Sequence, residues 1–113
     1  MIARLMGLET VSPAELQQFM RSGDVTTIDV NSRESWISAR VPGARLLDPA
    51  GYQEADLPAD KDALLVFYCS NPMCRKAPGA ARRAKAMGYG NVRVLSAGIR
   101  GWIGAGLPTE SGE

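Results

Sequence analysis

Two cysteines, Cys69 and Cys74, are the residues of this sequence best suited to chemistry. Cys69 ends a continuous apolar run, residues 63–69, and a loop of small and turn-forming residues follows it. Backbone N–H groups in such a loop, and the positive end of the next helix, stabilise a thiolate and hold an anion beside it. We therefore predict a nucleophilic Cys69 with a pKa below the usual value of about 8.5. The alternative is a small buried hydrophobe at the end of a core strand.

The predicted anion site is made of loop residues that follow Cys69. They are Ser70, Asn71, Met73, Cys74 and Arg75. Arg75 is interpreted as a clamp for an oxyanion, and the alternative is a solvated surface charge. Cys74 is either a bystander or a resolving thiol that attacks sulfur carried on Cys69. Both readings stay open, because the five-residue spacing allows a disulfide but does not require one.

The composition excludes several other kinds of site. The chain has no histidine, so Cys-His and Ser-His catalytic pairs and imidazole metal ligands are absent. Two cysteines cannot form a four-ligand zinc site, and neither a metal nor an organic cofactor is predicted. With 13 basic and 12 acidic residues the net charge is +1, which gives no reason to expect nucleic acid or a membrane surface as the main partner. Without a signal-like or membrane-spanning apolar run, we expect a reduced, cytoplasmic setting.

Turn-forming and apolar residues alternate along the chain in a way that predicts strands and helices in turn. Strands are expected at 25–30, 45–47, 64–69 and 91–95, and helices after Ser12, after Asn31-Ser32, from Pro78 to Gly88, and over 99–105. Ser12 and Glu15 form a capping box, and Ala77 is expected just before the helix opened by Pro78. This alternation predicts an α/β fold, with a central parallel sheet of four or five strands and helices on both faces. The tail over 109–113 is expected to fray.

Several short motifs, in their order and spacing, resemble a known family. They are Ile-Asp-Val (28–30), the aromatic Trp36, Val-Pro-Gly-Ala (41–44), Cys69 with its loop, Met-Gly-Tyr-Gly-Asn-Val-Arg-Val-Leu (87–95) and Ala-Gly-Ile-Arg-Gly-Trp (97–102). Together they make the chain resemble a single rhodanese-like domain over residues 1–113, with its core at about 11–108.

The resemblance implies an enzyme, a rhodanese-type sulfurtransferase. Cys69 would attack the outer sulfur of thiosulfate or a similar small anionic donor and become a persulfide. A thiol or cyanide would then accept the sulfur, and a sulfur-relay protein is a further possible partner. By the same resemblance Asp29 organises the site, whereas Trp36 and Trp102 are interpreted as core residues.

Departures from the family pattern lead to alternatives. Asn31 stands where an arginine is usual, and the loop after Cys69 is about two residues longer than in simple thiosulfate sulfurtransferases, so the physiological donor stays open. Cys69 and Arg75 are separated by five residues, and this Cys-x5-Arg spacing also matches the pattern of phosphatases and arsenate reductases. Against that reading, Tyr68 takes the place of a customary histidine and no general acid is evident. A third alternative is a non-catalytic sulfur-carrier or binding module.

Overall fold

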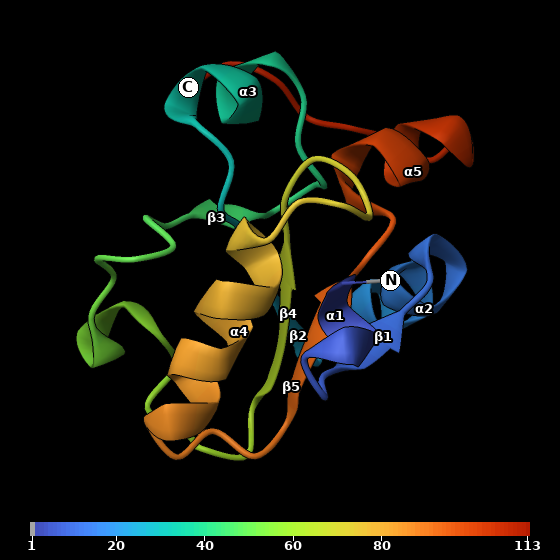
Figure 1. Cartoon of the computed structure of the whole chain (residues 1–113). Coiled ribbons are helices and arrows are strands. Elements are labelled where there is room, and N and C mark those ends of the chain that lie inside the picture. The colour runs from blue at the N-terminus through green and yellow to red at the C-terminus, as the bar shows by residue number, and fades with distance from the viewer. Residues whose placement is uncertain (1) are drawn as a thin grey trace.

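A parallel β-sheet forms the middle layer of the computed structural model, which describes residues 2–113 (Figure 1). The strands are β1 (Glu9–Val11), β2 (Val25–Asp29), β3 (Arg45–Leu46), β4 (Leu64–Tyr68) and β5 (Val92–Leu95). They lie in the order β1-β5-β4-β2-β3, and every neighbouring pair is parallel. The predicted α/β fold with a parallel sheet is therefore confirmed.

Helices cover both faces of this sheet. They are α1 (Ile2–Leu5), α2 (Pro13–Ser22), α3 (Arg33–Ser38), α4 (Lys76–Ala86) and α5 (Gly98–Gly104), with a 3₁₀ turn at Glu54–Asp56. Alternate residues of the central strand β4 point to opposite faces, which explains its unbroken apolar sequence. Phe67 packs in a cluster with alanines of α4, whereas Val66 packs in a second cluster with Leu16 of α2 and Trp102 of α5.

Local sequence signals set most helix ends. The Ser12 hydroxyl accepts from the Glu15 N–H (3.1 Å), and the Glu15 carboxylate accepts from the Ser12 N–H (2.8 Å), as predicted. The start of α4 was predicted wrongly. The helix begins at Lys76 with Arg75 as its N-cap, so Pro78 is its third residue and Ala77 lies inside it. Proline is tolerated there because N–H groups of the first turn have no partner within the helix.

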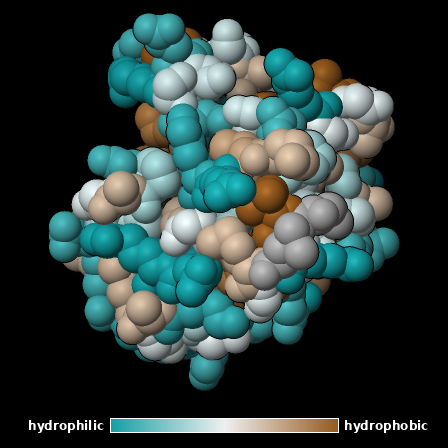
Figure 2. All heavy atoms as spheres, in the orientation of Figure 1, coloured by the Kyte–Doolittle hydropathy of each residue, from teal (hydrophilic) through white to brown (hydrophobic). Residues whose placement is uncertain are grey.

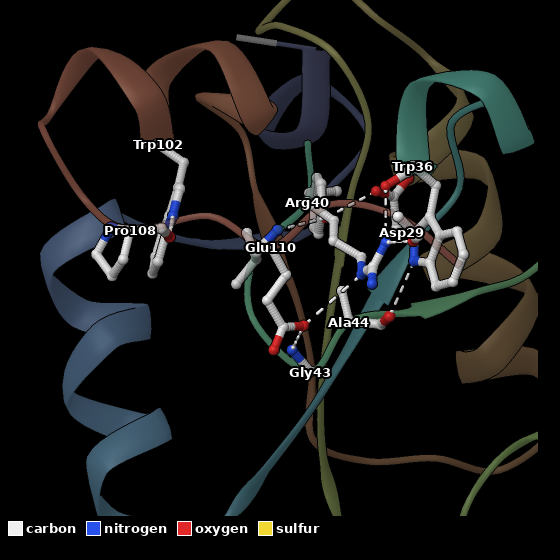
Figure 3. Close-up of polar contacts among 11 residues, drawn as sticks. Asp29, Trp36, Arg40, Gly43, Ala44, Trp102, Pro108 and Glu110 are labelled. Carbon is white, nitrogen blue, oxygen red and sulfur yellow. Dashed lines mark hydrogen bonds and ion pairs between the residues drawn. The ribbon is translucent and has the colours of Figure 1, made fainter. Parts of the chain in front are cut away.

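The predicted fraying of the C-terminal tail is also wrong. Arg40 and Glu110 pair through their backbones, with each N–H donating to the other carbonyl at 2.9 Å. The Glu110 carboxylate accepts from the Gly43 N–H at 2.8 Å and lies 3.7 Å from the Arg40 Nε (Figure 3). The tail therefore runs from α5 back to α3, across the carboxyl ends of the strands (Figure 1).

The two tryptophans differ in their environments. Trp102 is fully buried and its Nε1 donates to the Pro108 carbonyl at 2.7 Å, so its predicted core role is confirmed. Trp36 is only half-buried, which corrects the same prediction for that residue. Its Nε1 donates to the Ala44 carbonyl (3.0 Å), and the Arg40 guanidinium lies 3.9 Å from its ring centre (Figure 3). Trp36 thus supports the segment that the tail crosses.

The face of the molecule seen in Figure 2 is largely hydrophilic, and hydrophobic residues appear on it in small patches. Within residues 2–113, none of the helices combines the length and the apolar character that crossing a bilayer requires.

Candidate active site

The candidate site lies at the carboxyl ends of the central strands, where ligands bind in open α/β sheets. Asp29 ends β2, Cys69 follows β4 directly, and the segment before α5 follows β5. The Cys69 side chain is only 3% exposed. In Figure 1 the loop from β4 to α4 rises above the sheet and passes close to the start of α5.

The first part of this loop is anchored on α5. The carbonyls of Cys69 and Ser70 accept from the N–H groups of Ile99 (2.9 Å) and Arg100 (3.1 Å). Gly98 permits this close approach, since a Cβ built there would lie 2.5 Å from the Ser70 carbonyl carbon and oxygen. Gly98 also has a φ of 67°, which residues with side chains rarely adopt. The first turn of α5 therefore fixes the backbone beside Cys69.

The two thiols contact each other. The Cys69 and Cys74 side chains share a hydrogen bond, and both residues line one small cavity of about 10 Å³. Backbone N–H groups of Ser70 and Ala77 point at the Cys69 sulfur, and those of Ser70 and Lys76 point at the Cys74 sulfur. The loop and the first turn of α4 thus form a shared cradle for two sulfur atoms.

This cradle places negative charge differently from the prediction. Burial, followed by the hydrogen bond with Cys74, raises the pKa of Cys69 to about 12, so the predicted lowering is wrong. Burial also opposes ionisation of Cys74, but the hydrogen bond from Cys69 and the N–H groups of Lys76 and Ser70 bring its pKa below the usual value. Of the two thiols, Cys74 is therefore the one that ionises more readily.

Other predicted anion-site residues have separate roles. Asn71 closes a turn, because its side-chain Oδ1 accepts from the Met73 N–H (2.9 Å) and its carbonyl accepts from the Cys74 N–H (3.1 Å). These two N–H groups are therefore not directed at the sulfurs. Met73 is 72% exposed at the loop surface. Arg75 is also exposed, and it lines a surface groove with Pro49 and other residues outside the cysteine cavity.

A buried hydrogen-bond chain supports the loop from below. Asp29 is fully buried; its carboxylate accepts from the Tyr68 hydroxyl (2.7 Å) and from the Asn31 N–H (2.8 Å). The Tyr68 oxygen accepts in turn from the Val41 N–H (3.0 Å). At the other end the Ser70 hydroxyl donates to the Asn31 Oδ1 (2.9 Å). Asp29 is therefore linked through Asn31 to the residue next to Cys69.

Burial raises the pKa of Asp29, although the Tyr68 hydroxyl and the Asn31 N–H oppose that rise. Burial, followed by the neighbouring Asp29 carboxylate, also raises the pKa of Tyr68. The tyrosine therefore stays protonated and can donate to the carboxylate throughout the ordinary pH range.

Sequence reasoning missed three supporting residues: Asn31, Tyr68 and Gly98. The first two stood out only as departures from a family pattern, and Gly98 only as part of a motif. The sequence did offer a signal for Asn31, because it stands two positions after the strand-end Asp29. A carboxylate commonly accepts hydrogen bonds from residues this close in the sequence. The sequence offers no comparable signal for the link between Ser70 and Asn31.

Comparison with known proteins gives the following matches. A family model described as a rhodanese-like domain matches residues 12–105. The chain is 30% identical over 113 residues to the thiosulfate:glutathione sulfurtransferase of Homo sapiens, covering 88% of this chain and 96% of that protein. It is 34% identical over 106 residues to the HTH-type transcriptional regulator Rv0324 of Mycobacterium tuberculosis, covering 92% of this chain and 46% of the regulator. The chain thus spans about half the length of that regulator.

Solved structures share the fold. A thiosulfate sulfurtransferase from Pseudomonas aeruginosa has a TM-score of 0.82 and 25% identity, with coverage of 94% of this chain and 20% of that chain. A protein from Rhodopseudomonas palustris, described as a possible tyrosine phosphatase, has a TM-score of 0.75 and 25% identity, with coverage of 96% and 88%.

Proposed function

Because the chain belongs to the rhodanese-like family, we propose that it is a sulfurtransferase that carries sulfane sulfur as a persulfide on Cys69. The observation that carries the proposal is the cradle at the end of β4, where N–H groups of Ser70 and Ala77 point at the Cys69 sulfur. Such groups stabilise the negative charge that a persulfide develops. The similarity to a human enzyme named for thiosulfate and glutathione supports the same class of reaction.

The reaction divides one transfer into two displacements. Cys69 attacks the outer sulfur of a thiosulfate-like anion, a sulfur–sulfur bond forms, and sulfite leaves with the electron pair of the bond that breaks. A thiol or cyanide then attacks the terminal sulfur and takes it away, which returns Cys69 to its starting state. Asp29 acts in this proposal as a positioning residue, since it reaches the loop only through Asn31 and Ser70.

The expected substrates follow from the charges around the loop. Arg75 and Lys76 are exposed where the loop meets α4, and they attract a small anionic donor or an acceptor thiol that carries carboxylates. Both cysteines are free thiols, so the proposal includes a reducing, cytoplasmic setting. It includes no metal and no organic cofactor.

The phosphatase or arsenate reductase alternative has less support. It needs an arginine beside the nucleophile to hold a tetrahedral oxyanion. Arg75, however, lines a groove outside the cysteine cavity. The buried Asp29 is engaged by Tyr68 and Asn31, so it is not free to protonate a leaving group.

The first test is the intact mass of the protein before and after incubation with thiosulfate. Further reactions of the persulfide remove the added sulfur, and the gain in mass is then lost. Cyanide is therefore added to a second sample, and the thiocyanate that forms is measured. We expect thiocyanate to form with the wild-type protein and not with Cys69→Ser, a change that keeps Cys74. If thiosulfate gives no bound sulfur, no sulfite and no thiocyanate, while a phosphate ester is hydrolysed in a Cys69-dependent way, the phosphatase alternative replaces this proposal.

A further inference from the structure

The charges of this chain are divided unevenly along its sequence. The stretch over 63–109 contains the loop after β4 together with α4 and α5, and it holds none of the 12 acidic residues. Its basic residues are Arg75, Lys76, Arg82, Arg83, Lys85, Arg93 and Arg100. The net charge of +1 is therefore the sum of an acidic part and a cationic part, and the cationic part carries the candidate site.

Three of these cations line an open groove beside α4, which we call the α4 groove. They are Arg75, Lys76 and Arg83, and the groove is completed by small and apolar residues that include Pro49 and Ala50. In Figure 1 the segment that follows β3 passes beside α4. The groove measures about 520 Å³, whereas the cavity at the two cysteines measures about 10 Å³. It is therefore a separate surface feature, and it begins where the loop after β4 ends.

A second groove extends the α4 groove towards the cysteines. It shares Pro49 and Lys76 with the first and reaches Asn31. The Asn31 Oδ1 accepts from the hydroxyl of Ser70, which is the residue next to Cys69 (2.9 Å). A ligand that lies in the α4 groove can therefore extend to the residues that support Cys69.

The cations of the α4 groove are available to an external anion. Within residues 2–113, Arg75 and Lys76 are exposed and neither forms an ion pair. Arg83 is held in place, because its Nε and Nη2 donate to the Tyr52 carbonyl at 3.0 and 2.7 Å. A carbonyl does not neutralise a guanidinium, so Arg83 keeps its charge. Among the described residues that line the two grooves, only Asp48 is acidic.

The length of the α4 groove suits an extended polypeptide. Lys76 and Arg83 are seven positions apart in one helix, which corresponds to roughly 10 Å along its axis. An extended segment covers that distance with about three residues, and every second side chain faces the same way. Acidic side chains at alternate positions would then meet the cations, as acidic motifs do at arginine clusters. The described lining residues include no aromatic ring on which a nucleic-acid base could stack.

We propose that the α4 groove is a docking site for an extended acidic segment of a partner protein, and that this partner supplies the thiol that takes sulfur from Cys69. The docking site stands on the groove and its charges, whereas the sulfur cargo rests on the proposed function. In the transfer, the partner's thiolate sulfur bonds to the terminal sulfur of the Cys69 persulfide. The bond between that sulfur and Cys69 breaks, and Cys69 keeps the electron pair as a thiolate, so the total charge is unchanged.

The docking site is tested by fluorescence anisotropy in the absence of thiosulfate. The probe is a labelled peptide of about eight residues in which Glu and Ala alternate after a single cysteine. We expect it to bind, to bind more weakly as the salt concentration rises, and not to bind when Gln replaces each Glu. Arg75→Gln combined with Lys76→Gln should weaken binding by roughly 5- to 10-fold. Gly79→Glu should also weaken it, because it places a like charge in the groove where nothing lies within 4 Å of the new Cβ.

The matched control is Arg82→Gln combined with Lys85→Gln. It removes the same charge from exposed positions of the same helix that line neither groove, and it should change binding by less than about 2-fold. Equal weakening by the two double variants would overturn the docking site, because net charge alone would then attract the peptide. Equal affinity for a three-residue version of the peptide would assign the groove to a small ligand instead. Tighter binding of single-stranded RNA of the same charge would assign it to nucleic acid.

The transfer is measured separately, by the intact mass of the peptide after the protein has been treated with thiosulfate. We expect the peptide to gain one sulfur, and Gly79→Glu to slow that gain more than it slows thiocyanate formation from cyanide. Selective binding without any sulfur on the protein would leave the docking site in place and overturn the proposed function. Thiocyanate formation without selective binding would overturn the docking site and leave the proposed function. Selective binding by a sulfur-loaded protein that transfers nothing to the peptide would overturn the partner's role as acceptor.

Discussion

At the scale of single residues, the site includes a carboxyl group that is fully buried. Asp29 is fully buried and is stabilised by two hydrogen bonds, one from Tyr68 and one from the Asn31 backbone. Burial nevertheless dominates and raises the pKa of Asp29 above the usual value of 3.8. The folded state therefore binds a proton on Asp29 more tightly than the unfolded chain does. The resulting contribution to stability is fully present below about pH 4 and is lost as the pH rises through the folded-state pKa.

Tyr68→Phe is expected to destabilise the protein more at neutral pH than in acid. The change leaves a carboxylate oxygen of Asp29 and the Val41 N–H without this partner, at a cost of about 2–3 kcal/mol. It also raises the pKa of Asp29 further, so ionisation at neutral pH adds to the cost. Urea unfolding at about pH 4 and pH 7 measures the difference. Tyr52→Phe is the matched control, because the Tyr52 hydroxyl donates to the Ala80 carbonyl (2.7 Å) and should give a loss that does not change with pH. Equal losses for Tyr68→Phe at both pH values would contradict the expectation.

At the scale of elements, α5 determines the shape of the loop after β4. Its first residues donate N–H groups to the carbonyls of Cys69 and Ser70, and Gly98 leaves room for that contact. The helix thereby anchors the first residues of the loop. An anchored loop keeps its N–H groups directed at the sulfurs before any substrate arrives, which lowers the cost of reorganisation during the reaction.

Gly98→Ala is expected to displace the loop. The new Cβ would meet backbone atoms of Ser70 and Asn71 at 2.5–2.6 Å, and the backbone would keep an unfavourable positive φ. Strain of this kind costs about 1–3 kcal/mol, and a small misplacement of the loop should reduce sulfur transfer by roughly 10²-fold. Thermal unfolding and the rate of thiocyanate formation measure the two effects. Gly104→Ala, which adds a methyl to the same helix with nothing within 4 Å, should leave both close to wild type. A fully active Gly98→Ala protein would show that the contact does not shape the site.

The elements also show what the sequence can predict. The apolar run before Cys69 and the capping box at Ser12 predicted β4 and α2, because strong local patterns decide both. The edge strand β1 has only three residues, too few for a pattern, and its partner β5 is remote in the sequence. The pKa of Cys69 was predicted wrongly, since the N–H groups of the loop are a local property whereas burial depends on the whole fold.

At the scale of the whole molecule, the C-terminal tail packs against the segment from Arg40 to Gly43, next to the site. The Glu110 carboxylate and the Gly43 N–H that it accepts from are 67 positions apart. Between them and the site, the Val41 N–H donates to Tyr68, and Tyr68 donates to Asp29. A contact between residues so far apart in the sequence produces no local sequence pattern, so the sequence alone led to the wrong prediction that the tail frays. Figure 3 shows how the tail, the Arg40 segment and Asp29 come together.

Glu110→Ala is expected to lower the free energy of unfolding by about 1 kcal/mol, because the Gly43 N–H loses its partner and Arg40 loses an ion pair. Urea unfolding measures the loss. Glu113→Ala is the matched control in the same tail. Its ion pair with Arg33 joins two side chains that are 72% and 63% exposed, so its removal should have almost no effect. Equal effects of the two changes would mean that the Glu110 side chain does not secure the tail.

The small cavity around the two sulfurs also limits which molecules can reach them by size. Its volume of about 10 Å³ leaves room for roughly one water molecule, and one of the two cysteines that line it, Cys69, is only 3% exposed. We expect slender anions to reach Cys69 more easily than bulky electrophiles or large thiols, which meet Cys74 or the loop first. If Cys69 carries sulfur as proposed, that sulfur is shielded from bulky molecules, so the size of a reactant decides what it meets as much as chemical reactivity does.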